Sequence, residues 1–139
     1  VGFNGYLNVI IGMFITIMVQ SSSITTSTLT PLAAVGLIGL EDMLPLTLGA
    51  NIGTTVTALL ASMTGSPQAV TVALVHLFFN LTGIAIIYPI AAIRHIPIRL
   101  ARGLARKTAE KRIYALLYMV GIFFVMPLVF VMLDKLLRA

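Results

Sequence analysis

The first 93 residues contain only two charged side chains, Glu41 and Asp42, and no lysine or arginine. Over the whole chain 59% of the residues are hydrophobic and 9% are charged, whereas soluble domains carry about 25% charged residues. Such a chain cannot present a normal polar surface to water. The long apolar runs therefore predict an all-α integral membrane protein, because a helix satisfies its own backbone hydrogen bonds in lipid.

Two uncharged segments are long enough to cross a bilayer, whose hydrocarbon core requires roughly 20 apolar residues per helix. They are residues 69–93 and residues 113–133. Between them, residues 94–112 contain seven lysines and arginines and one glutamate. The positive-inside rule places this basic segment in the cytoplasm, as a loop or as a helix lying on the lipid headgroups. Because the basic residues are concentrated there, they do not indicate nucleic-acid binding.

Residues 3–40 combine two short apolar arms with a polar centre. From Gln20 to Thr30, eight of the eleven residues carry a hydroxyl group. Each arm has about 15 residues, or about 22 Å of helix, which is short for a membrane crossing. We expect a re-entrant helical hairpin with the QSSS segment at its tip, buried in protein or facing a water-filled cavity. A single long helix over 3–40 is the alternative.

Residues 44–64 are also uncharged, but Gly49, Asn51 and Gly53 interrupt their centre. Glycine and asparagine weaken a helix, so we expect a discontinuous transmembrane helix with an unwound middle. The alternative is that Gly49 and Gly53 form a GxxxG contact between closely packed helices. Similarly, the hairpin hydroxyls can simply bond to carbonyls of their own helix.

Two interrupted segments close in sequence are typical of a transporter binding site. Helix ends that face a gap offer N–H groups to an anion and C=O groups to a hard cation. Neither polar centre contains a charged side chain, so a multiply charged anion held there needs co-bound cations. We expect no enzymatic activity, because the chain has no cysteine, no hydrolase, zinc-protease or nucleotide-binding motif, and no pair of carboxylates within a span.

Several motifs, in their order and spacing, resemble those of the type II sodium-dependent phosphate cotransporters. They are QSSS at 20–23, TP at 30–31, PLTLGANIGTT at 45–55, HLFFNLTG at 76–83, YP at 88–89 and IPIRLARGL at 96–104. That family is built from two inverted repeats, each with a QSSS hairpin, and its site lies between them. The resemblance therefore implies that this chain is the second, C-terminal repeat, part of a longer protein, with the N-terminal repeat of the same transporter as its partner.

The resemblance also implies the roles of individual residues. It implies phosphate contacts for Ser21, Ser22, Ser23, Asn51, Thr54 and Thr55, and sodium contacts for Gln20, Thr25 and Asn51. Many animal members have serine in place of Ala50, so a sodium contact from that side chain is missing here.

At the level of the whole protein, the resemblance implies one half of an inverted-repeat transporter. Its expected function is sodium-coupled symport of inorganic phosphate across the plasma membrane, with Na⁺ as the co-transported ion. We expect a multi-pass protein of a bacterial inner membrane. The alternatives are a symporter of another oxyanion or small carboxylate, and a membrane module that does not transport.

Overall fold

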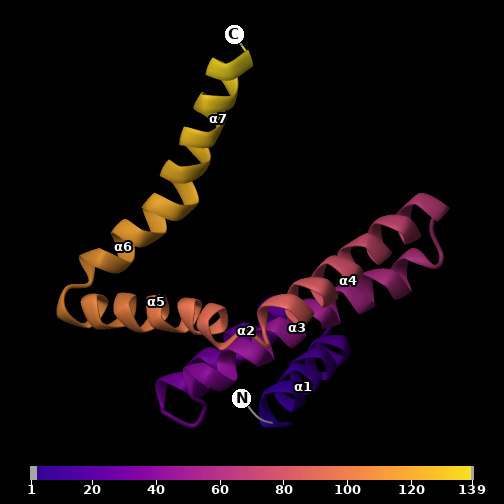
Figure 1. The fold of residues 1–139 in the computed structure, drawn as a ribbon, viewed down its shortest axis with the longest axis horizontal. Coiled ribbons are helices and arrows are strands. Elements are labelled where there is room, and N and C mark those ends of the chain that lie inside the picture. The colour runs from indigo at the N-terminus through magenta and orange to yellow at the C-terminus, as the bar shows by residue number, and fades with distance from the viewer. Residues whose placement is uncertain (1–2, 139) are drawn as a thin grey trace. The chain divides into compact units, whose positions relative to one another are not determined.

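A computed structural model describes residues 3–138, and these are almost entirely helical (Figure 1). The chain divides into two units, Val1–Ile98 and Arg99–Ala139, and each is described by itself. The elements are α1 (Phe3–Val19), α2 (Ser22–Ala34), α3 (Leu40–Ser62), α4 (Pro67–Ile87), α5 (Ala91–Glu110), α6 (Ile113–Val120), the π-helical segment η1 (Gly121–Val125) and α7 (Met126–Arg138).

The first two helices meet at a sharp turn at Gln20. This residue has a φ of 58°, in the left-handed region that ends a right-handed helix. Ser21 then caps α2, because its Oγ accepts a hydrogen bond of 3.3 Å from the N–H of Ile24. Residues 3–40 therefore form two short helices of 17 and 13 residues, and not the single long helix.

The third helix, α3, is continuous from Leu40 to Ser62, so the expectation of an unwound centre in residues 44–64 is wrong. The glycines of this segment lie where α1 approaches most closely. A Cβ at Gly49 would collide with the α1 backbone, and a Cβ at Gly53 would lie 2.6 Å from the carbonyl oxygen of Met13. The close packing of α1 against α3 thus explains the glycines, and this packing offsets their low helix propensity.

Helices α1 and α3 run parallel to each other. Near their starts, the Asn8 amide donates a hydrogen bond of 3.0 Å to the Asp42 carboxylate. Further along both helices, Thr16 packs against Gly53. Since Gln20 follows Thr16 by one helical turn, α1 ends beside the second half of α3. One helical turn beyond Gly53, roughly five residues of α3 remain before its end at Ser62. The helix therefore continues for about 8 Å beyond the hairpin tip.

Helices α3 and α4 form an antiparallel pair (Figure 1). Ser66 caps α4 by accepting a hydrogen bond from the N–H of Ala69, and Pro67 occupies the first turn. The uncharged segment 69–93 does not continue as one helix, because α4 ends at Ile87. Pro89 lacks the N–H that would continue the helix, and α5 begins after it.

Three helical segments among the described residues are long and apolar enough to cross a membrane: Leu40–Ser62, Pro67–Ile87 and Ile113–Leu137. The last comprises α6, η1 and most of α7. Within it, the N–H of Met126 bonds to the carbonyl of Gly121, five residues back. This hydrogen bond closes a π-helical turn, which is wider than an α-helical one, just before Pro127. The proline ring does not fit a regular α-helical turn.

Candidate functional site

The hairpin tip, which we define as Gln20–Ser23, is held against α3 through Thr16, whose exposure is 0%. The Thr16 hydroxyl donates a hydrogen bond of 3.0 Å to Oγ1 of Thr25 on α2. On its other side, the Thr16 Cβ would lie 2.7 Å from a Cβ at Gly53. One buried threonine therefore connects both polar segments singled out from the sequence.

Thr25 is itself buried, at 3% exposure, and its hydroxyl donates to the carbonyl of Ser21 at 3.0 Å. This bond ties the first turn of α2 to the contact with Thr16. Sequence reasoning included Thr25 but missed Thr16. The available signal was weak: Thr16 is a single hydroxyl within the apolar arm that precedes the tip.

Most threonine hydroxyls around the tip donate to carbonyls of their own helix, as the alternative interpretation of the sequence held. In α3, Thr54 donates to Ala50 at 3.1 Å and Thr55 donates to Ile52 at 2.7 Å. In α2, the donors are Thr25, Thr26, Thr28 and Thr30. A hydroxyl used in this way keeps its oxygen lone pairs as acceptors. These oxygens therefore suit a cation better than an anion.

The serines at the tip have a different environment. Within residues 3–138, the hydroxyls of Ser22 and Ser23 donate to no protein group. The backbone carbonyls of these two residues accept hydrogen bonds from the Thr26 hydroxyl. The N–H groups in the first turn of a helix have no partner within that helix, and the helix N-terminus carries a partial positive charge. This end of α2 therefore offers uncharged donors to an anion.

The predicted site residues do not gather in one enclosed cavity of this chain. Ser23 lines a shallow hollow of about 340 Å³ with Ile24, Ser27 and Thr28. These four side chains are exposed, whereas Thr25 faces the packed side of α2.

The remaining predicted site residues also differ in how exposed their side chains are. Gln20 and Asn51 are exposed, Ser21, Ser22 and Thr54 are half-buried, and Thr55 is buried. The structure thus brings Thr25 and the glycine segment of α3 together through Thr16. It leaves Asn51 and the tip serines accessible to a partner or a ligand. Among the described residues, no cluster of three His, Cys, Asp or Glu could hold a metal ion.

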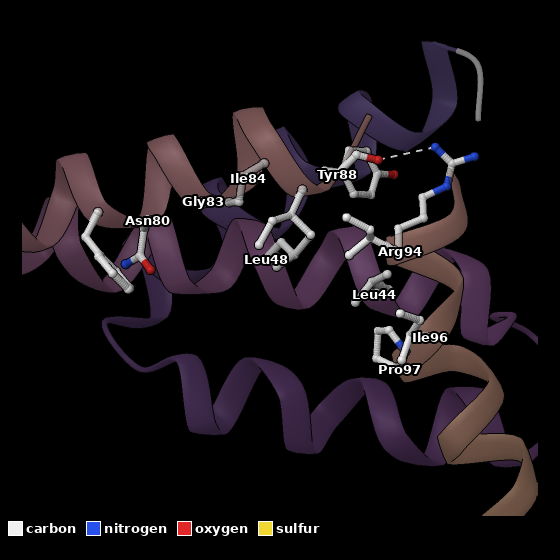
Figure 2. A pocket seen from close by; sticks show the side chains of 12 residues that line it. Leu44, Leu48, Asn80, Gly83, Ile84, Tyr88, Arg94, Ile96 and Pro97 are labelled. Carbon is white, nitrogen blue, oxygen red and sulfur yellow. Dashed lines mark hydrogen bonds between the residues drawn. The ribbon is translucent and has the colours of Figure 1, made fainter. Parts of the chain in front are cut away.

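A separate pocket of about 360 Å³ lies between α3, α4 and the first turns of α5 (Figure 2). None of the predicted phosphate or sodium contacts lines it. At one end, the Arg94 guanidinium donates a hydrogen bond of 3.3 Å to the carbonyl of Tyr88. The same group lies 5.8 Å from the centroid of the Tyr88 ring, and that ring meets Tyr6 of α1 edge-on at 5.4 Å.

A family model described as Na⁺/Pi-cotransporter matches residues 3–131. The chain is 48% identical over 129 residues to sodium-dependent phosphate transport protein 2B of Mus musculus, covering 89% of this chain and 18% of the relative. It is 47% identical to protein 2B of Homo sapiens, with the same coverage of each chain. It is 45% identical to protein 2A of Ovis aries, covering 88% of this chain and 20% of the relative.

The chain therefore spans about a fifth of the length of these curated relatives. No solved structure matches it. The family match extends over nearly all of the described residues, including the hairpin tip and the glycine segment. This chain belongs to the Na⁺/Pi-cotransporter family.

Proposed function

We propose that this chain supplies one half of a sodium-coupled phosphate symporter of the plasma membrane, as the second of two inverted repeats. The observation that carries the proposal is the buried Thr16–Thr25 hydrogen bond, which holds the donor-bearing end of α2 against α3. A phosphate dianion bound by such neutral donors retains its charge. Burying it is too costly without accompanying cations, and this cost couples phosphate binding to sodium binding.

The lengths of the helices support a re-entrant hairpin. Helix α3 is long enough to cross the membrane and continues for about 8 Å past the level at which α1 ends. This difference in length supports a hairpin tip that lies inside the membrane and not at its far surface. Hydroxyl groups exposed at that depth require a protein neighbour or a water-filled cavity. We infer that the N-terminal repeat of the same transporter covers this face.

Within this site, the two ions would use different atoms. Phosphate fits the free donors of Ser22 and Ser23 at the start of α2. Sodium fits side-chain oxygens such as those of Gln20 and Asn51, which are exposed and uncharged. Thr25 is buried and already accepts a hydrogen bond from Thr16. A sodium contact at Thr25 therefore requires the α1–α2 interface to open.

Uptake of labelled phosphate into proteoliposomes containing the full-length protein tests the proposed function. We expect accumulation with an inward Na⁺ gradient and none when K⁺ replaces Na⁺. Arsenate should compete, whereas sulfate and dicarboxylates should not. Uptake that sulfate or a dicarboxylate suppresses more strongly than unlabelled phosphate would identify a symporter of another anion. Phosphate binding without Na⁺-driven accumulation would identify a module that does not transport.

A further inference from the structure

The pocket between α3, α4 and α5 has a wall that is almost entirely hydrocarbon (Figure 2). Its apolar lining includes Leu44 and Leu48 of α3, Ile84 and Ile87 of α4, and Ile96 and Pro97 of α5. Ile87 and Ile96 are 49% and 50% exposed. The pocket therefore opens on the surface of this chain, beside two helices, α3 and α4, that are long and apolar enough to cross a membrane.

Arg94 lies at the end of this pocket where α4 has ended and the basic helix α5 has begun. Its Nη1 donates to the neutral carbonyl of Tyr88, but its Nε is buried and has no hydrogen-bond partner among the described residues. An unsatisfied buried donor is destabilising, most of all on a charged group. Because the Nε is covered by protein atoms, a ligand in the pocket would meet the terminal nitrogens of this guanidinium, and an anionic oxygen such as that of a phosphate ester is their strongest partner.

The Arg94 side chain is held in place from two directions. The Tyr88 ring lies beneath the guanidinium, and Tyr6 of α1 packs edge-on against the same ring. The cation is therefore ordered before any ligand arrives, which lowers the entropic cost of binding.

We propose that this pocket binds one anionic phospholipid from the leaflet in which Arg94 lies. The phosphate of the lipid contacts Arg94, and one acyl chain lies along α4 from Ile87 towards Asn80, a distance of about 10 Å. The positive-inside rule assigns this end to the cytoplasmic leaflet, which is the anionic one. A charged group at the interfacial end and hydrocarbon along the rest match a lipid better than a protein segment. This site is distinct from the proposed phosphate-transport site.

Native mass spectrometry of the full-length protein tests the proposal. The protein is purified in detergent and mixed with phosphatidylglycerol and phosphatidylcholine that carry identical acyl chains. Detergent removes the surface potential of a bilayer, so the lipids that stay bound report direct contacts. We expect the wild-type protein to retain phosphatidylglycerol about fivefold better than phosphatidylcholine, because both lipids offer a phosphate to Arg94 but the choline cation offsets its charge and weakens the ion pair.

Two matched charge variants locate the headgroup. Arg94→Gln should abolish the preference for phosphatidylglycerol while the acyl chain can still bind. Arg106→Gln removes the same charge from an exposed position on the same helix, outside the pocket, and should leave the preference unchanged. Equal retention of the two lipids by the wild-type protein, or a preference that survives Arg94→Gln, would overturn the proposal.

Gly83→Leu tests the acyl-chain part of the site. Gly83 lines the pocket, and a Cβ added there would meet nothing within 4 Å. Leucine should therefore fill the pocket without disturbing α4 and should reduce the retention of both lipids.

Unchanged retention in the Gly83→Leu variant would show that the pocket is covered by protein or that lipid binds elsewhere. Displacement of phosphatidylglycerol by inorganic phosphate alone would assign Arg94 to a free anion, and the proposal would fail. Because these measurements record lipid retention and not uptake, their failure is distinguishable from a failure of the proposed transport function.

Discussion

Close to the hairpin tip, the Thr16 hydroxyl links α1 to α2 through its hydrogen bond to Thr25. The position of Thr16 in the sequence does not indicate this role. Thr16→Val preserves the shape that packs against Gly53 but removes the donor to Thr25. We expect this change to lower the free energy of unfolding by about 1 kcal/mol, measured as a reduced midpoint of thermal unfolding in detergent. Thr16→Ser keeps the hydroxyl and serves as the control. A valine variant as stable as wild type, beside a less stable serine variant, would show that the methyl packing matters and the hydrogen bond does not.

Ser22 is the residue whose free hydroxyl the proposed function assigns to phosphate. Ser22→Ala should raise the KM for phosphate by roughly tenfold, since a hydrogen bond to a charged group is lost. Expression should be unchanged, because the serine is not in a packed core. The matched control is Thr30→Val, which removes an α2 hydroxyl that donates to the Thr26 carbonyl of its own helix. If Ser22→Ala transports phosphate with wild-type kinetics, the tip does not bind the substrate.

Asn51 is exposed on α3, and its amide oxygen is one of those that we assign to sodium. Asn51→Ala should increase the Na⁺ concentration required for half-maximal uptake, because an amide oxygen ligand is removed. Uptake measured across a series of Na⁺ concentrations checks this shift. A lower yield of protein with an unchanged Na⁺ dependence would instead show that Asn51 serves the folding of α3.

At the scale of elements, the parallel contact between α1 and α3 depends on glycine. Gly53→Ala places a Cβ 2.6 Å from the Met13 carbonyl oxygen and should destabilise the protein by about 1–3 kcal/mol through overpacking. Gly83→Ala makes the same substitution in α4, where the Cβ meets open space, and should be neutral or stabilising. Thermal unfolding of the two variants measures the difference. Equal effects would contradict the close approach of α1 and α3.

The same contact explains where sequence reasoning about the elements succeeds and where it fails. The dense hydroxyl run suggests an interruption, and the chain does break between two short helices, but the break lies at Gln20 and Ser21, and the hydroxyl run from Ser22 onwards forms most of α2. The glycines of α3 also suggest an interruption, yet α3 is continuous, because helix propensity takes no account of a neighbouring helix that requires small residues. The end of α4 at Ile87 is predictable, because Pro89 marks it in the sequence. The prediction of a helix extending to residue 93 is wrong because it follows the absence of charge and disregards the proline. Thr16 is not predictable, because nothing local shows that it faces Thr25.

For the whole molecule, the positive-inside rule predicts a fixed orientation in the membrane. This chain has no cysteine, so in a full-length protein whose other cysteines are replaced, single cysteines introduced at Thr64, in the turn after α3, and at Ala109, near the end of α5, report on their own positions. A membrane-impermeant thiol reagent applied to intact cells should label the cysteine at 64. The cysteine at 109 should react only after the membrane is permeabilised. Labelling of both positions in intact cells would contradict the assigned topology.

In the proposed function, the uncharged donors at the start of α2 hold phosphate only when sodium is bound beside it. The most direct measurement is the binding of labelled phosphate to the purified full-length protein in detergent at increasing Na⁺, with ionic strength held constant by choline. We expect saturable phosphate binding that rises with Na⁺ and is absent in choline alone. Phosphate binding of equal affinity in choline and in Na⁺ would contradict it.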